Sequence, residues 1–403
     1  MDFYRWIQRM TQAGFFAVAM FAIVTFQNAI PEEMYVKAGE EISYDFGVPV
    51  RVVMKEEGAE VLANFSERVR SSDASYTITC KLFGIFPVGD VKVNLVEDRQ
   101  VYASGETIGI YVKTKGVLVI DTATVTDASG DRVSPAKHLV KGGDYIVSVN
   151  GEAVSVKEDL TEKITAAGNA KDVLGVYRNG EYIEVSMTPV RDDAGNYLLG
   201  IWVRDDLAGV GTLTYYEDDY FGALGHAVSD GDTGTQMELS EGWIYPAKIV
   251  GIRKGENGTP GELSGVIDYQ GHRPLGEIAD NTGLGIYGTL DRQQQKTIDA
   301  EAYEVGYKQT VHPGTAYIIS EVSGERESYE IRIQNLDFSK YAENKGILFE
   351  VTDRRLLEVT GGIVQGMSGS PIIQDGKLIG AVTHVFVSDS TRGYGIFIEK
   401  MLH

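Results

Sequence analysis

A serine flanked by glycines near the end of the chain carries the clearest chemistry. Residues 366–371 read Gly-Met-Ser-Gly-Ser-Pro, and Ser368 is the first of the two serines. A nucleophilic serine needs a tight turn that exposes its oxygen, and backbone amides aimed at the oxyanion that forms during attack. Gly366 and Gly369 permit such a turn, and the amides of Gly366 and Ser368 could form the oxyanion hole. The segment therefore predicts Ser368 as a nucleophile, with Ser370 as its rival.

A nucleophilic serine also needs a base, and near neutral pH the best candidate is a histidine. The chain has six histidines, and His226 lies in residues 221–230, directly after Gly225, early in a β-rich region. A histidine beside a glycine can be approached closely, and the serine motif lies downstream, so we predict His226 as the general base. No two histidines have the spacing of a zinc-binding helix, so we expect neither a metal site nor a cofactor.

The serine segment continues into an apparent hairpin that turns at Asp375-Gly376. This stretch resembles the nucleophile hairpin of chymotrypsin-like serine peptidases, whose signature is Gly-Asp-Ser-Gly-Gly-Pro. The resemblance implies a double β-barrel, and it makes Thr383, His384 and Val385 the strand that binds substrate backbone. Met367 replaces the acidic residue of the signature, so activation by a newly formed N-terminus is not implied.

The second half of the chain has a repeating β pattern. Residues 191–403 hold many short apolar runs separated by turn residues, with no sustained helical period. Such spacing favours an all-β barrel or sandwich. We therefore expect a mainly β protein with a peptidase domain at 191–403.

The region before it, residues 101–190, has strand-like runs and an Asn150-Gly151 dipeptide typical of hairpin turns. Its order of elements resembles a bacterial PDZ domain. That resemblance implies that the amides around Thr107, Ile108, Gly109 and Ile110 hold a peptide carboxylate, while the next strand edge pairs with the peptide.

The first 30 residues have the pattern of a membrane anchor. Residues 14–26 are almost wholly apolar, with Arg5 and Arg9 before them and Glu32 and Glu33 after them. This polarity predicts a cytoplasmic N-terminus and an extracytoplasmic remainder. The alternative is a cleaved signal peptide. Residues 31–100 then form a β-rich lead-in.

Composition narrows the possible partners. The chain has 403 residues, which suggests two or three domains, and a formal net charge of −21. So acidic a protein is repelled by phosphate backbones, which argues against nucleic acid as a partner. The single cysteine, Cys80, cannot form an internal disulfide.

Taken together, the anchor, the PDZ-like unit and the two catalytic motifs resemble the stage IV sporulation protein B (SpoIVB) peptidase family. The resemblance transfers the histidine and serine of the family to His226 and Ser368, and its aspartate to Asp353. Asp230 and Asp232, close to the histidine in sequence, are rival acids, and a Ser–His dyad also remains open.

The family resemblance implies an intercompartmental signalling protease of sporulation, located in the forespore intermembrane space. Such a protease cleaves itself and a membrane-bound regulator of an intramembrane metalloprotease, which triggers pro-sigma-K processing. One alternative is an envelope quality-control PDZ serine protease, but there the PDZ unit follows the peptidase domain. Another is a non-catalytic PDZ scaffold, against which the intact His226 and Ser368 argue.

Overall fold

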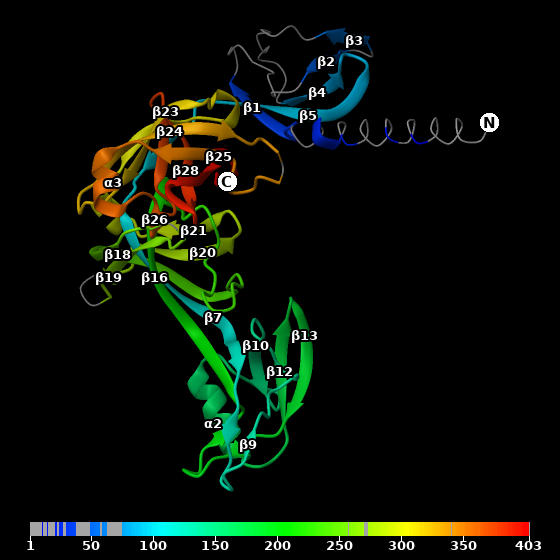
Figure 1. Cartoon of the computed structure of the whole chain (residues 1–403), viewed down its shortest axis with the longest axis vertical. Helices are drawn as coiled ribbons and strands as arrows, with labels where there is room; N and C mark the ends of the chain where they lie inside the picture. Colours follow the sequence, from blue (N-terminus) through cyan, green and yellow to red (C-terminus); the bar gives the residue numbers. More distant parts are fainter. Residues whose placement is uncertain are drawn as a thin grey trace, which may run out of the picture.

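The computed structural model of the chain is mainly β, as the sequence predicts (Figure 1). It describes residues 10, 14, 21, 24–26, 30–37, 49–56, 59–62, 75–256, 258–269, 273–339 and 341–402. Most of the predicted anchor at residues 1–30 lies outside these ranges, so the anchor stays a prediction. Within the described ranges no helix is both long and apolar enough to cross a membrane.

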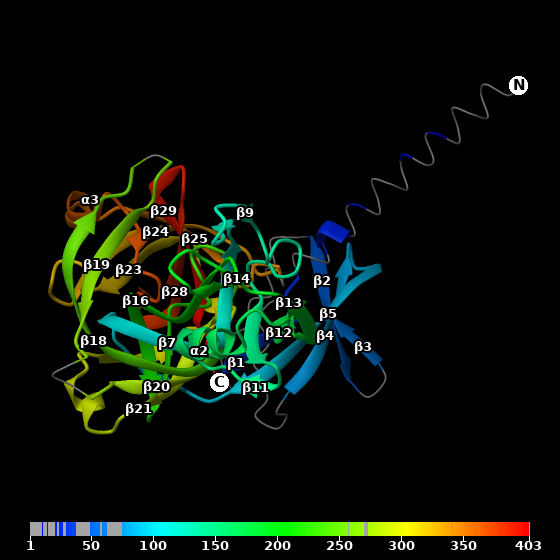
Figure 2. The ribbon, with the colours of Figure 1, turned by 90° about the horizontal axis from the view of Figure 1, so that it is seen from below.

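The predicted lead-in forms a small sheet of its own, which lies to one side of the other strands in Figure 2. Among the described residues the strand order is β1-β5-β4-β2-β3. Cys80 is fully buried in the core of this sheet beside Ile78 and Val91, and burial raises the pKa of its thiol to about 12. The strands are β1 (Glu33–Lys37), β2 (Val50–Glu56), β3 (Ala59–Leu62), β4 (Ser75–Leu82) and β5 (Phe86–Val96).

Further along the chain, six strands pair into a closed ring. In the described part of the chain the pairing runs β7-β16-β17-β21-β20-β18 and returns to β7. Alternate side chains point inward and form one core, with Ile108, Ile110, Phe221 and Ile286. We call these strands the first ring. They are β7 (Thr107–Thr122), β16 (Ile201–Glu217), β17 (Tyr220–Ala223), β18 (Leu239–Arg253), β20 (Gly276–Thr282) and β21 (Gly285–Leu290).

A second ring of six strands follows. Its pairing, again among described residues, runs β23-β24-β25-β29-β28-β27 and returns to β23. Its core includes Ile331, Phe349, Met367 and Ile372. The strands β27 and β28 are the hairpin that the sequence predicts after the serine. The bounds are β23 (Gly314–Ser320), β24 (Glu327–Leu336), β25 (Ile347–Val351), β27 (Pro371–Gln374), β28 (Lys377–Phe386) and β29 (Asp389–Phe397).

Short elements join the two rings. Strand β6 pairs with β16 of the first ring and with β22, which in turn pairs with β28 of the second. Strand β19 pairs antiparallel with β18 and in parallel with β26, just before the serine turn. These elements are β6 (Gln100–Ala103), β19 (Gly261–Ile267), β22 (Glu301–Val305), α3 (Arg354–Thr360) and β26 (Val364–Gln365), with short 3-10 turns at Gln294–Thr297, Lys308–Thr310 and Ile398–Lys400.

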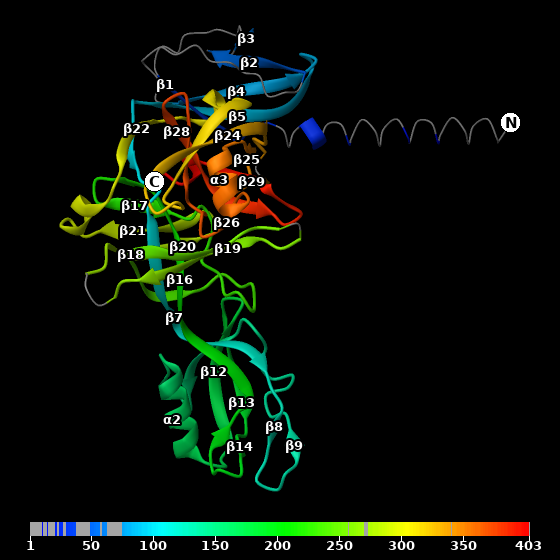
Figure 3. The same cartoon turned by 60° about the vertical axis from the view of Figure 1, so that its left-hand side comes forward.

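Residues 115–205 form a unit that we call the insert, because it lies between two strands of the first ring. Figures 1 and 3 show it at one end of the molecule, joined to the ring by the long strands β7 and β16. It has its own core, in which Val119, Leu160, Ile164 and Leu174 are buried. Its elements are β8 (Val125–Thr126), β9 (Arg132–Val133), β10 (Tyr145–Val149), β11 (Glu152–Ala153), α2 (Lys157–Ala167), β12 (Asp172–Arg178), β13 (Glu181–Met187), β14 (Val190–Arg191) and β15 (Tyr197–Leu198).

The boundary between ring and insert is an irregularity in the β7–β16 pairing. Arg204 lies opposite Leu118, whereas Asp206 lies opposite Lys113, so β7 carries extra residues at this point. Gly116, within them, has φ +91°, and a Cβ there would lie 2.6 Å from the carbonyl oxygen of Ile146. The bend that separates the two cores therefore depends on a glycine.

This arrangement differs from the domain borders expected from the sequence. The first half of β7 belongs to the first ring and β6 joins the two rings, so neither belongs to a unit at 101–190. Gly109 pairs with Val210 of β16 on one edge and with Tyr245 of β18 on the other. Ile108 to Ile110 are thus paired on both edges, and Thr107 is paired with Thr212 on one. This strand is not a carboxylate-binding loop, and its paired edges cannot take up a peptide strand.

Candidate active site

A cleft of about 460 Å³ between the two rings brings the predicted catalytic residues together. Its first-ring side includes Ile110, Leu224 and His226, and its other side includes the serine turn and the end of β28. The predicted residues that line it are His226, Gly366, Ser368, Thr383, His384 and Val385. Although 142 positions separate the histidine from the serine, the two rings place both in one cleft.

The turn that carries Ser368 is built on two glycines and fastened to the first ring. Gly366 and Gly369 have φ of +101° and +96°. A Cβ at Gly369 would lie 2.2 Å from the carbonyl oxygen of Thr212, so only glycine fits. Thr212 on β16 donates its amide to the Ser368 carbonyl at 3.1 Å and its hydroxyl to the Gly366 carbonyl at 2.9 Å. The first ring therefore helps to shape the turn of the second.

The backbone amides of this turn divide into two groups. Those of Met367, Gly369 and Ser370 donate to carbonyl oxygens at 2.8–3.1 Å. For the amides of Gly366 and Ser368 no acceptor is present among the described residues. Unpaired donors beside a nucleophile are what an oxyanion hole requires, and they are the two amides that the sequence singles out.

The hydroxyl of Ser368 is engaged by a backbone group. It donates to the carbonyl oxygen of Thr383 at 2.9 Å. No hydrogen bond joins it to His226 in the part of the chain that the structure describes. Catalytic hydrogen bonds are often long or misaligned before substrate binds. Attack therefore requires the hydroxyl to rotate from β28 toward the imidazole.

His226 is partly buried, and its ring is fixed by a backbone carbonyl. Its Nδ1 lies 2.9 Å from the carbonyl oxygen of Ala227, which fits a neutral ring that donates from Nδ1. Nε2 is then the free acceptor that a general base needs. Burial lowers the pKa of His226, while the Ala227 contact acts in the opposite direction.

The second histidine of the cleft, His384, lies beside the first. The ring centroids of His226 and His384 are 5.5 Å apart. The pKa of His384 is lowered to about 4, first by burial and then by the charges of His226 and Lys345. The His384 ring is therefore uncharged near neutral pH. It sits on β28, where it can contact substrate.

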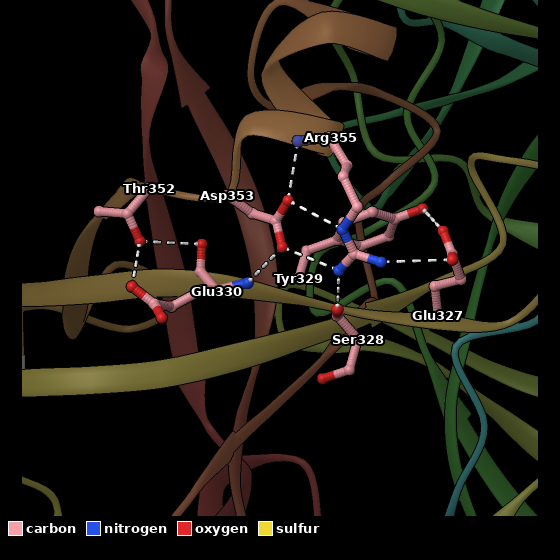
Figure 4. A network of polar contacts seen from close by, with 7 residues as sticks. All are labelled: Glu327, Ser328, Tyr329, Glu330, Thr352, Asp353 and Arg355. Carbon is pink, nitrogen blue, oxygen red and sulfur yellow. Dashed lines mark hydrogen bonds and ion pairs between the residues drawn. The ribbon is translucent and has the colours of Figure 1, made fainter.

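The third residue carried over from the family, Asp353, lies in another network (Figure 4). It caps α3, accepting the Arg355 amide at 2.8 Å, and its other oxygen accepts from the Arg355 guanidinium at 2.9 Å. The Glu330 amide donates to it at 3.3 Å. The ion pair with Arg355 lowers the pKa of Asp353. The structure does not bring Asp353 together with His226.

The rival acids are also engaged elsewhere. Asp230 and Asp232 both form ion pairs with Arg204. The group at Nδ1 of His226 is the Ala227 carbonyl. A backbone carbonyl in this role leaves no sequence signal, because every residue has one. Thr212, which shapes the serine turn, was missed for a similar reason, since an isolated threonine on a strand carries no motif.

No cluster of three or more histidine, cysteine or acidic side chains in the described ranges is arranged to hold a metal ion. The cleft brings together a hydroxyl, two imidazoles and two backbone amides.

A serine on a glycine turn, unpaired amides beside it and a histidine across the same cleft are the groups that a serine hydrolase needs. Comparison with family models agrees: residues 195–402, just over half of the chain, match the family described as SpoIVB peptidase S55. The chain belongs to this family. It is thus a serine peptidase of sporulation, acting on protein substrates.

Proposed function

We propose that Ser368 is the nucleophile and His226 the general base of a chymotrypsin-like endopeptidase. The support for the double β-barrel is the pair of six-stranded rings, each with its own core, with the cleft between them. The observation that carries the proposal is the convergence of Ser368, His226 and the free amides of Gly366 and Ser368 on this cleft.

In this mechanism the substrate adds to the end of β28. Among the described residues, His384 and Val385 pair only with β29, so the other edge of this segment is available for an extended peptide. The scissile carbonyl oxygen would then point at the amides of Gly366 and Ser368.

The chemical steps follow from these positions. The Ser368 hydroxyl turns from the Thr383 carbonyl to Nε2 of His226, which takes its proton as Oγ bonds to the carbonyl carbon. The two amides stabilise the resulting oxyanion. His226 then protonates the leaving amine, and a water activated by the same imidazole hydrolyses the acyl-enzyme.

We infer that the Ala227 carbonyl orients His226, so the enzyme works as a Ser–His dyad. Asp353 remains the candidate acid of the family resemblance, but to act it would have to leave Arg355 and the N-terminus of α3. Comparing Asp353→Asn with wild type separates the dyad from a triad.

The insert is proposed to be the PDZ-like unit, with its peptide edge in a different place from the one the sequence suggested. Gly200, with φ +66°, precedes the start of β16. Residues Ile201 to Val203 pair with β7 on one edge, and α2 lies against β16 in the same core. The remaining edge between β16 and α2 is where a peptide could add as a strand.

The biological role proposed here is that of a signalling protease tethered outside the cytoplasm by its N-terminal segment. It would cleave itself and a membrane-bound regulator of an intramembrane metalloprotease, and so trigger pro-sigma-K processing. The support is the family and the N-terminal charge pattern.

Mass mapping of the N-termini of purified wild type and Ser368→Ala tests self-cleavage. The proposal expects a shortened N-terminus in the wild type alone, and identical termini in both proteins would contradict it.

A fluorophosphonate probe tests the alternative of a non-catalytic PDZ scaffold. A scaffold without activity would fail to react with the probe.

A further inference from the structure

The loop that follows His226, residues 227–238, is tied to the first ring at both ends. We call it the His226 loop. The Asn281 side chain on β20 accepts the amide of Val228 at 2.8 Å, and it donates to the carbonyls of Val228 and Met237 at 2.9 Å each. One asparagine thus fixes the loop two residues after the histidine and again near its end.

The middle of the loop is organised around Asp230, whose side chain is fully buried. One carboxylate oxygen accepts from the amides of Asp232 and Thr233 and from the Thr233 hydroxyl, at 2.8–3.1 Å. The other oxygen accepts from the guanidinium of Arg204. Burial acts to raise the pKa of Asp230, but the Thr233 bonds and the Arg204 charge outweigh it and lower that pKa. The loop therefore folds around a charged carboxylate that has one cation as its partner.

That cation lies outside the loop, at the junction of ring and insert. Arg204 is on β16, opposite Leu118, at the irregularity where the strand leaves the insert. Its second terminal nitrogen donates to Asp232 at 2.9 Å. Removing one partner of an ion pair whose other partner is buried leaves an uncompensated charge, which is strongly unfavourable. The shape of the loop thus depends on Arg204.

The insert supports the same loop at a second place. The Tyr145 hydroxyl, on β10, accepts the amide of Glu238 at 3.1 Å. A Cβ at Gly143 would lie 3.2 Å from the hydroxyl oxygen of Thr235, so the loop passes close to the insert backbone. The segment directly after the catalytic histidine is therefore packed against both the first ring and the insert.

From these contacts we propose that Arg204 is a positioning residue for catalysis: through Asp230 it holds the His226 loop so that the imidazole faces Ser368. The inference rests on the proposed role of His226 as the base. Arg204 touches neither nucleophile nor substrate. It acts on the geometry of the imidazole, and misplacement of a catalytic group by about 1 Å can cost on the order of 10²-fold in rate.

The test uses the full-length protein and two neighbouring ion pairs on the same strand. Arg204→Ala removes the partner of Asp230. The control, Lys157→Ala, removes the cation paired at 2.8 Å with Asp205, the next residue of β16, whose partner lies on α2 instead of the loop. Adjacent strand residues point to opposite faces, so both variants disturb β16 but only one reaches His226. Arg204→Lys is included as the conservative variant.

The readouts are kcat and KM on a short peptide and the rate of fluorophosphonate labelling. We expect Arg204→Ala to lower kcat and the labelling rate about tenfold with KM nearly unchanged, Arg204→Lys to recover part of the loss, and Lys157→Ala to stay near wild type. If Arg204→Ala does not fold, Arg204→Lys decides by the same criterion.

A wild-type kcat in the folded arginine variants would overturn the inference, as would equal losses in Arg204→Ala and Lys157→Ala. His226→Ala, measured alongside, separates this outcome from failure of the proposed base. Should His226→Ala stay active, the base assignment itself fails. Should it be inactive while Arg204→Ala is unaffected, only the positioning role fails.

Discussion

The hydroxyl of Ser368 donates to the main-chain carbonyl of Thr383 at 2.9 Å, on the strand expected to bind substrate. A peptide that pairs with this strand will compete for the same backbone region. Substrate binding and release of the nucleophile toward His226 are therefore expected to be coupled events.

Ser368→Ala should abolish peptide hydrolysis and self-cleavage without loss of the fold, because the side chain makes one hydrogen bond and the turn is held by the backbone. Ser370→Ala is the matched control. Ser370 is fully buried, and its hydroxyl has no partner among the described residues, so this variant should keep near-normal kcat/KM. Full activity in Ser368→Ala, or inactivity in a folded Ser370→Ala, would move the nucleophile to Ser370.

The loss of kcat/KM at acidic pH, which we call the acid limb of the profile, should have its midpoint below the ordinary histidine pKa of about 6.5. The base must be neutral to accept a proton, and burial disfavours the charged imidazole of His226, so activity is lost only as pH falls through the lowered pKa. The measurement is kcat/KM against pH on a short peptide. A midpoint above the ordinary value would contradict the burial argument.

The same experiment on His384→Gln identifies which imidazole is titrated. Burial lowers the pKa of His384 to about 4, and it also lowers the pKa of His226. Replacing His384 leaves the titration of His226 in place. The limb should persist in the variant, even if KM changes. Its disappearance would assign the titration to His384.

Asp353→Asn should lower kcat by less than about tenfold, because Asp353 caps α3 and pairs with Arg355. Its stability cost should be below about 1 kcal/mol, because Asn caps a helix about as well as Asp and only the ion pair with the half-exposed Arg355 is lost, measured by denaturant unfolding. A fall in kcat approaching 10⁴-fold, the scale seen when a triad acid is neutralised, would restore Asp353 to the active site.

Gly109→Ala should destabilise the protein instead of merely impairing peptide recognition. A Cβ at Gly109 would lie 2.4 Å from the Ile267 side chain, and overpacking of this kind costs about 1–3 kcal/mol. Gly209→Ala is the control, since its Cβ would meet no atom within 4 Å. Unfolding midpoints should separate the two variants, and equal stability would show that the strand can readjust.

Local motifs account for what the sequence could predict. The glycines around Ser368 and the Asp375-Gly376 turn fix a short stretch of backbone, so the nucleophile turn and its hairpin were predictable. His226 could be chosen because a flanking glycine is a local signal. The mainly β class followed from the spacing of turns.

Long-range pairing accounts for what could not be predicted. Thr107 to Ile110 looks like a loop followed by a strand, but its partners, β16 and β18, lie about a hundred residues or more away in sequence. The chain enters the insert on β7 and leaves it on β16, two paired strands that are far apart in sequence. No local signal marks where the insert begins and ends, so the predicted borders differ from the observed ones. The family resemblance gave no sign that the Asp353 carboxylate would pair with Arg355, two residues away, and not with the histidine.

Locating the covalent adduct of a fluorophosphonate probe tests the central claim most directly. Wild type and His226→Ala are labelled in parallel, digested and mapped by mass spectrometry. The account predicts one adduct on the peptide containing residues 366–371, at Ser368, formed at a greatly reduced rate in His226→Ala. An adduct on another serine, or equal labelling rates in the two proteins, would contradict it.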